Sequence, residues 1–285
     1  MVFSIVSGLF AGVIYGLLAV GLVLIYQVSR TINFAASSIG VLAAFFYAEL
    51  VVRDGWPIFP AIVLGTALAG LLGAIGQLII ARPLKNRSPI AATLATFGYG
   101  ELLYNVATAR YGTIPAEAPD LFEGEGFRVG SVYVTRANVA MLIIGIIIVC
   151  TLTFVSRHSR TGLRLRATAL DAESAIQIGV RTDRVALGMW TLAAAVTGLA
   201  AILISQQIAF TTYFMTPLML SALIAALMGG LTSVIGAFVG GIVLGGVEGM
   251  LQYLFNAPGA PEAILAVFVV AVLVVRPLGL RSAEY

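Results

Sequence analysis

Three carboxylates lie inside long apolar runs of this 285-residue sequence, at Glu49, Glu101 and Glu248. A carboxylate at membrane depth normally faces a bundle interior or a hydrated cavity, where it can relay a proton or contact a polar solute. Asn105 and Thr108 follow Glu101 at spacings of four and three residues, which aligns the three on one helical face. We therefore predict a polar stripe along a solute pathway, with Glu101 as its strongest candidate.

The other two carboxylates favour structural roles. Glu49 is near the end of its apolar run, which indicates a position at the membrane surface. Glu248 lies between glycine stripes, where a hydrogen bond to a neighbouring helix is favoured over ligand contact. The sequence has no phosphate-binding loop, no HExxH and no serine elbow, and it has one cysteine and one histidine. We therefore expect no catalytic residue, no metal site and no cofactor held by this chain.

The elements that must hold these residues are membrane helices. The sequence is 60% hydrophobic and 10% charged, with a mean hydropathy of +1.04, which no soluble domain of this length can bury. The prediction is an all-α, polytopic transmembrane bundle of eight to nine segments in a single domain, 1–285, with short or broken second, seventh and ninth segments. The predicted spans are 3–27, 33–52, 58–81, 89–109, 137–155, 185–206, 214–230, 234–255 and 261–276.

The basic residues predict the orientation. Twelve of the sixteen Lys and Arg lie on one side of the predicted bundle, and positively charged loops normally stay in the cytoplasm. The 156–184 loop, with six arginines, is therefore expected inside, together with the C-terminus. The N-terminus and the 111–135 loop, read as a small surface cap, are expected outside. The net charge of +3 comes from membrane-flanking loops, which argues against a nucleic-acid surface.

The 156–184 loop has a local pattern of its own. A helix is expected over 162–170, with a narrow apolar face made by Leu163, Ala167 and Leu170. Asp171 is a good N-cap for a short second helix from Ala172 to Ile178, and Gly179 is well placed to end it. The alternative is an ordinary solvated basic loop whose arginines only fix the topology.

Small residues predict how the helices pack, because close backbone approach replaces the hydrophobic drive that lipid cannot supply. Both the first and the eighth predicted spans carry glycines four residues apart, so we place them in the bundle interior. The glycines are Gly8, Gly12 and Gly16 in the first span, and Gly236, Gly240, Gly241, Gly245 and Gly249 in the eighth.

Two apolar segments are interrupted by polar residues, at 33–38 and 228–233. Irregular backbone at membrane depth survives only where protein buries it or water reaches it, and such breaks often hold transported solutes. Asn33, Ser37 and Ser38 are therefore candidate pathway residues. Plain turns between helices at the membrane surface are the alternative.

Four blocks of the sequence carry a resemblance to a known family. They are GVIYGLLAVGLVLIYQVSRTINFA (12–35), TLATFGYGELLYN (93–105), RTGLRLRATALDAESAIQIGVRTDRV (160–185) and MGGLTSVIGAFVGGIVLGGVEGML (228–251). The chain resembles the inner-membrane permeases of bacterial high-affinity branched-chain amino acid ABC transporters.

The resemblance implies a set of partners. Cytoplasmic ABC ATPase subunits, which bind ATP with Mg, would dock on a coupling helix spanning Asp171 to Gly179. A substrate-binding protein would deliver solute at the outer face, and a second permease subunit, a different but related chain, would complete the membrane part. The coupling residues implied are Asp171, Ala172, Glu173, Ala175, Ile178 and Gly179.

Two departures from the family pattern fall in the expected pathway. After residues 32–35 the family commonly continues with His-Gly, where this chain has Ala36 and Ser37, and Glu101 replaces a usually apolar residue. The resemblance therefore indicates an importer permease without naming its solute. The competing class is a stand-alone secondary transporter or facilitator for a small polar solute, with Glu101 as its relay. Such a carrier has no need of a capped short helix beneath the membrane.

Overall fold

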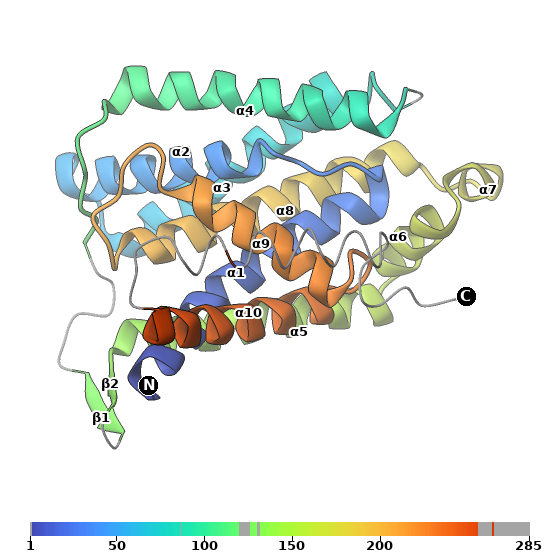
Figure 1. Cartoon of the computed structure of the whole chain (residues 1–285). Coiled ribbons are helices and arrows are strands. Elements are labelled where there is room, and N and C mark those ends of the chain that lie inside the picture. Colours follow the sequence, from blue (N-terminus) through green and yellow to red (C-terminus); the bar gives the residue numbers. More distant parts are fainter. Residues whose placement is uncertain (1, 86, 120–125, 130–131, 256–263, 265–285) are drawn as a thin grey trace.

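The computed structural model describes residues 2–85, 87–119, 126–129, 132–255 and 264, and these form a helical bundle (Figure 1). Apolar segments of the predicted lengths fold as helices because only internal hydrogen bonding satisfies the backbone in lipid. In chain order the elements are α1 (Val2–Ser29), α2 (Ala36–Ala48), η1 (Glu49–Arg53), α3 (Ile58–Gly76), η2 (Gln77–Ala81), α4 (Pro89–Tyr111), β1 (Phe127–Val129), β2 (Val132–Val134), α5 (Arg136–His158), α6 (Arg160–Leu170), α7 (Ala172–Gln177), α8 (Thr182–Ser205), α9 (Met215–Gly229) and α10 (Val234–Phe255).

Six helices in the described part are long and apolar enough to cross a membrane. They are Phe3–Ser29, Ala36–Arg53, Ile58–Ala81, Arg136–His158, Thr182–Ser205 and Val234–Phe255. The chain is therefore a multi-pass membrane protein. Two further predicted spans also fold as helices: α9 is shorter, with 15 residues, and α4 has 23 residues but does not meet the same criterion. The ninth predicted span, 261–276, lies outside the described residues except for Ile264.

The glycine faces bring α1 and α10 into backbone contact. A Cβ built on Gly12 would lie 2.6 Å from the carbonyl oxygen of Gly241, and one on Gly16 would lie 2.7 Å from that of Phe238. The other face of α10 packs on α9, because a Cβ at Gly240 would lie 2.6 Å from the carbonyl oxygen of Ala225. The helix is therefore held between two neighbours, and larger side chains at these glycines would push the helices apart.

Other glycines of the predicted stripes also lie at close helix contacts. Gly8 and Gly245 face each other across the α1–α10 contact, as Gly229 and Gly236 do across the α9–α10 contact. Glu248 is half-buried on α10. The small residues at this contact are thus distributed along the whole length of α10.

The long helices run between two ends of the molecule (Figure 1). The β1–β2 hairpin and the start of α1 lie at one end, and α6 and α7 lie at the other, which we call the α7 end. The two strands of the hairpin are antiparallel, with Phe127 opposite Val134. Ala116 and Phe210 also exchange backbone hydrogen bonds of 2.8 and 2.9 Å, which joins two connecting loops near the hairpin end.

Two of the membrane helices end in π-helical turns, which were not predicted. In η1 the amide of Asp54 donates to the carbonyl of Glu49, and in η2 the amide of Arg82 donates to the carbonyl of Gln77. Each extra residue in a turn rotates the side chains that follow it, and such turns are frequent at functional sites. Both turns in this chain carry charged residues at or beside them.

Candidate functional site

The connection between α1 and α2 runs back into the bundle before α2 begins (Figure 1). Its extended backbone is satisfied by one side chain of α4: the Thr96 hydroxyl accepts the amide of Phe34 at 3.1 Å and lies 3.2 Å from the carbonyl oxygen of Ile32. Gly100, one turn further along α4, allows close approach, because a Cβ there would lie 3.1 Å from Cα of Ala35. Protein therefore buries this irregular segment, as backbone inside a membrane requires.

Sequence reasoning did not single out Thr96. Its signal is the four-residue spacing to Gly100 within TLATFGYG, a small polar and a small apolar residue on one face. That spacing indicates a contact only if residues 30–35 are known to pack against α4, and the sequence pattern does not show this tertiary contact.

The predicted pathway residues of this break lie at the start of α2. Asn33 is 1% exposed, and its Oδ1 accepts the amide of Ala35 at 3.1 Å, while its buried Nδ2 has no hydrogen-bond partner among the described residues. Ser37 donates to the carbonyl of Phe34, and Ser38 is buried. The segment thus presents an unpaired amide donor inside the bundle.

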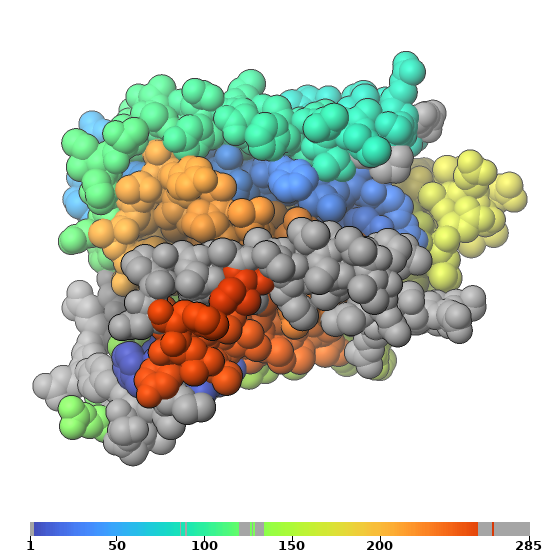
Figure 2. Space-filling view, viewed as in Figure 1, coloured from blue at the N-terminus to red at the C-terminus, as the bar shows by residue number. Residues whose placement is uncertain are grey.

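The polar stripe of α4 has a different setting. Glu101 and Asn105 are exposed on the outer surface of the bundle, and the Asn105 side chain donates to the backbone carbonyl of Glu101 at 2.7 Å. Thr108 is half-buried, with its hydroxyl 3.5 Å from that of Thr212. Figure 2 shows α4 along one edge of the molecule, with its side chains open to the surroundings. Glu101 and Asn105 therefore face away from this chain, whereas Thr108 contacts it, and the part of these residues in a pathway stays a prediction.

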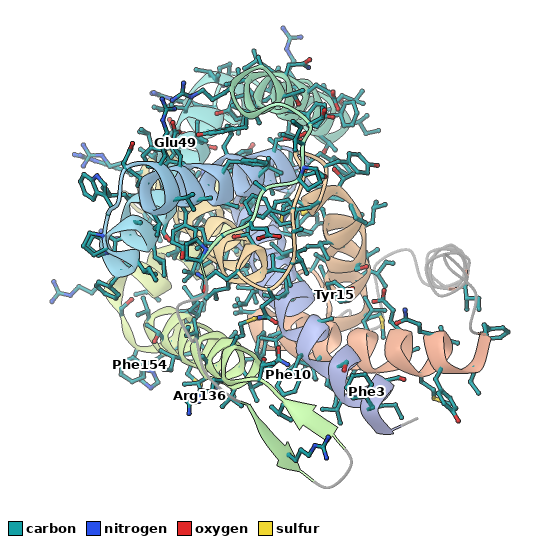
Figure 3. All side chains as sticks on the ribbon, turned by 90° about the vertical axis from the view of Figure 1, so that its left-hand side faces the viewer. Phe3, Phe10, Tyr15, Glu49, Arg136 and Phe154 are labelled. Atoms are coloured by element: carbon teal, nitrogen blue, oxygen red, sulfur yellow. The ribbon has the colours of Figure 1, made fainter. Side chains whose placement is uncertain are left out.

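Glu49 forms the centre of a charged cluster near the hairpin end, between η1 and α4 (Figure 3). Its carboxylate accepts from Arg110 at 2.7 Å, from Arg53 at 3.3 Å and from the Tyr111 hydroxyl at 3.0 Å. The Tyr111 ring stacks on Phe45, with centroids 4.8 Å apart. Glu49, predicted at the membrane surface, thus also links the end of α2 to α4. We call Glu49, Arg53, Arg110 and Tyr111 the Glu49 cluster.

The α6–α7 segment folds as its local pattern predicts. Ser159 caps α6 by accepting the amide of Gly162, and Asp171 caps α7 by accepting the amide of Glu173 at 3.0 Å. Hydrogen bonds from the Ser174 hydroxyl and nearby amides lower the pKa of the Asp171 carboxyl, so the cap stays charged further into the acidic range than an ordinary Asp. Gly179 has φ +85°, the left-handed conformation that ends a helix.

Apolar side chains on this segment lack a cover in the described structure. The predicted face of α6 is exposed, with Leu163 at 63% and Leu170 at 76%, whereas the residues of α6 that bury are Gly162, Leu165 and Thr168. Ile176 and Ile178 on and after α7 are 54% and 75% exposed. An exposed apolar patch of this kind is typical of an interaction surface. Figures 1 and 2 show α7 projecting beyond the rest of the bundle.

The same segment is attached to the core. Ala175 is 2% exposed, and its carbonyl accepts the amide of Val180 at 2.9 Å, which folds the end of α7 back toward α8. Arg30, at the end of α1, donates to the carbonyl of Ala169 at 2.6 Å. In turn Trp190 of α8 donates to the Ser29 hydroxyl at 2.8 Å. A displacement of α7 would therefore reach both α1 and α8.

Comparison with known proteins assigns the chain to a family. The model of the family described as "Branched-chain amino acid transport system / permease component" matches residues 4–276. The chain belongs to this permease family. No solved structure matches the chain.

Curated members of the permease family agree. The high-affinity branched-chain amino acid transport system permease protein LivH of Escherichia coli K12 is 26% identical over 213 residues, which cover 70% of this chain and 69% of LivH. LivH of Salmonella typhimurium has the same identity and coverage. The permease protein BraD of Pseudomonas aeruginosa is 25% identical over 216 residues, covering 72% of this chain and 70% of BraD. The chain is thus the permease component of an ABC-type transport system, as the sequence predicted.

Proposed function

We propose that this permease forms the membrane pathway of an importer for branched-chain or related amino acids, driven by separate ATPase subunits that dock on α7. The observation that carries the proposal is the preformed α7: a capped, projecting helix with uncovered apolar side chains, attached to α1 and α8. The names of the relatives, LivH and BraD, supply the substrate class. ATP and Mg would be bound by the partner subunits, and the chain itself would catalyse no reaction.

The proposed orientation places the α7 end in the cytoplasm and the N-terminus outside. The loops at the α7 end contain ten basic residues in the described part, against four at the hairpin end. In this orientation α4 and α9 cross as well, which gives eight spans in the part of the chain that the structure describes.

Cysteine labelling tests the orientation. In a Cys150→Ser background, Glu117→Cys at the hairpin end and Gln177→Cys at the α7 end provide two exposed positions. An impermeant maleimide should label Glu117→Cys in intact cells and Gln177→Cys only after permeabilisation. Labelling of both positions from one side would refute the proposed topology.

The proposed pathway uses both polar regions of the membrane part. Asn33, Ser37 and Ser38 would line it from the α1–α2 break, where the Asn33 amide has an unused donor. Glu101 and Asn105 would line it from α4. Since a charged side chain against lipid is costly, the exposed stripe of α4 is best satisfied by facing a second permease subunit across a hydrated space. A substrate-binding protein would deliver solute at the hairpin end.

Charge reversal on α7 tests the coupling. Glu173 is exposed, and only its backbone amide donates to the Asp171 cap. Glu173→Arg should therefore leave α7 folded while it disrupts docking. Asp171→Ala removes the cap itself. Both variants should co-purify with less ATPase and should lose solute-stimulated ATP hydrolysis.

The matched control is Glu117→Arg, the same reversal at an exposed position of the opposite end. It should retain wild-type amounts of bound ATPase. If all three variants bind the ATPase and hydrolyse ATP at wild-type rates, α7 is not the docking element. If wild-type chain takes up solute without any ATPase subunit, the chain works alone and the importer proposal is wrong.

A further inference from the structure

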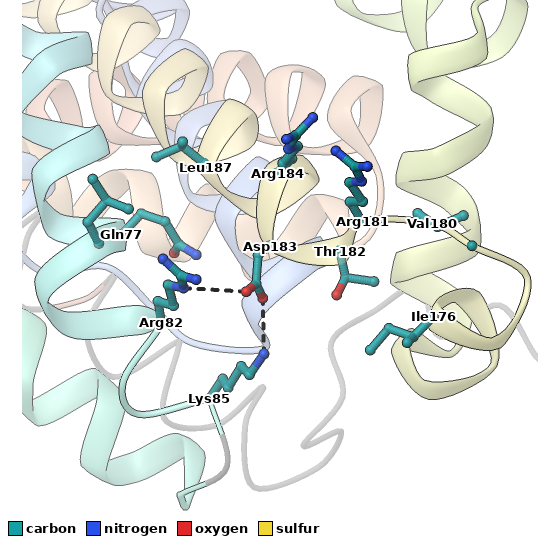
Figure 4. A pocket seen from close by; sticks show the side chains of 12 residues that line it. Gln77, Arg82, Lys85, Ile176, Val180, Arg181, Thr182, Asp183, Arg184 and Leu187 are labelled. Atoms are coloured by element: carbon teal, nitrogen blue, oxygen red, sulfur yellow. Dashed lines mark hydrogen bonds and ion pairs between the residues drawn. The ribbon is translucent and has the colours of Figure 1, made fainter.

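A cavity of about 620 Å³ lies at the α7 end, between η2 and the junction of α7 with α8 (Figure 4). It adjoins the face of α7 that we assign to the ATPase, because Ile176 and Gly179 line one side of it. Its lining comes from the last turn of the third predicted span and the turn after it, from the end of α7 and the α7–α8 connection, and from the start of α8. The cavity therefore opens where two membrane helices reach the membrane surface.

The charges around this cavity do not balance. Arg82 and Lys85 both pair with Asp183, at 3.4 and 3.0 Å. Arg181 and Arg184 also line the cavity, and both are exposed without an acidic partner among the described residues. The described lining thus carries four cationic side chains around one carboxylate. Such an excess of positive charge favours an anion.

A buried polar atom points to a ligand as well. Gln77 lines the cavity and is 4% exposed, and its Oε1 has no hydrogen-bond partner among the described residues. A buried amide oxygen without a donor is unfavourable, so a molecule in the cavity that brings an N–H or O–H group would satisfy it. Gln77 begins the π-helical turn, and its carbonyl accepts the backbone amide of Arg82, five residues later.

The apolar part of the lining decides between ligands. Leu78 of η2 is 46% exposed, and its neighbour Ile79 is 59% exposed on the same apolar helix. Leu187, one turn into α8, also lines the cavity. A free phosphate has no use for these side chains, whereas the acyl chain of a lipid would pack against them while its headgroup meets the cations. Basic pockets between membrane helices at the cytoplasmic surface are suited to anionic lipid headgroups.

We propose that this cavity binds the phosphodiester headgroup of an anionic phospholipid. Arg181 and Arg184 would contact the phosphate, and a glycerol hydroxyl would donate to Gln77. Such a lipid would tie the α7–α8 junction to the membrane surface. The inference goes beyond the proposed transport function, because a lipid can bind here whatever solute the permease carries.

The test uses the purified full-length permease in nanodiscs of phosphatidylcholine alone or with phosphatidylglycerol. Affinity for phosphatidylglycerol is measured by competition with a fluorescent anionic lipid. The double variant Arg181→Gln/Arg184→Gln should bind about fivefold more weakly for each arginine removed. The matched control is Arg157→Gln/Arg160→Gln, which removes two exposed arginines of the same loop outside the cavity.

The results separate the alternatives. The proposal predicts preference for phosphatidylglycerol over phosphatidylcholine in wild type and control, and loss of that preference in the cavity variant. Inorganic phosphate at millimolar concentration should not compete; equal competition would make this a site for soluble phosphate and overturn the lipid assignment. Absence of any anionic preference, or an equal loss in the control, would also overturn it, as expected if an acidic segment of the ATPase fills the cavity instead. Because ATPase binding is measured separately, failure here leaves the proposed function standing.

Discussion

Two charged clusters, one at each end of the bundle, share a plan and differ in strength. In each, one carboxylate forms ion pairs with two cations beside a π-helical turn. In the Glu49 cluster the carboxylate is 15% exposed and also accepts the Tyr111 hydroxyl. In the cluster of Asp183, Arg82 and Lys85, which we call the Asp183 cluster, the carboxylate is 40% exposed. The cations are more than half exposed in both clusters, so the carboxylates make the difference.

The difference indicates which end can move. A partly buried carboxylate that accepts three hydrogen bonds holds its partners firmly, because breaking any contact leaves a charge poorly solvated. Exposed ion pairs contribute little, since water and salt screen them. The hairpin end is therefore fixed by the Glu49 cluster, whereas the ion pairs of the Asp183 cluster at the α7 end are contacts that a partner can replace at small cost. That asymmetry suits a permease driven from the α7 end.

The largest effect is expected from Glu49→Ala. The substitution leaves Arg110 and Arg53 without their acceptor and removes the partner of Tyr111, so it should destabilise the permease by about 2 kcal/mol. Thermal unfolding of the purified chain in detergent measures the loss. Glu117→Ala is the control, because Glu117 and Glu49 line one pocket at the hairpin end but Glu117 is exposed, and it should change stability by less than about 0.5 kcal/mol. Equal effects of the two variants would mean that the Glu49 cluster fastens nothing.

How much of this could be predicted from the sequence depends on the range of the interactions involved. The positions of the helices follow from the length of each apolar run, and the Asp171 cap and Gly179 stop follow from contacts two to five residues apart. These are local, so their pattern is visible in the sequence. The family also followed from four sequence blocks.

The features that were missed depend on residues far apart in the chain. Thr96 reaches a backbone segment more than sixty residues away, and Glu49 meets Arg110 across 61 positions. No periodicity encodes such pairs. The π-helical turns were missed for a related reason, since a turn of this kind keeps the apolar composition of the helix that contains it. The exposure of Glu101 likewise depends on which face of α4 packs against α2.

A smaller effect is expected where the α7 end joins the core. Arg30→Gln removes the hydrogen bond to the carbonyl of Ala169, which should cost about 1 kcal/mol and raise hydrogen exchange in α6. Arg87→Gln removes an exposed arginine at the same end and should leave the exchange of α6 unchanged. If both variants exchange like wild type, α6 is attached to the core by other contacts and Arg30 transmits nothing.

The smallest effect is expected from Asp183→Asn, and it tests the comparison most directly. Because both ion pairs of Asp183 are largely exposed, the substitution should cost less than about 1 kcal/mol, and the cost should vanish in high salt. Asp54→Asn, at an exposed acid near the hairpin end, is the control for a lost surface charge. Asp183→Asn also raises the excess of positive charge in the lipid cavity, so the affinity for phosphatidylglycerol should increase while stability barely changes. A loss of stability as large as that of Glu49→Ala, insensitive to salt, would show that the α7 end is fastened as firmly as the hairpin end, and the proposed asymmetry would fail.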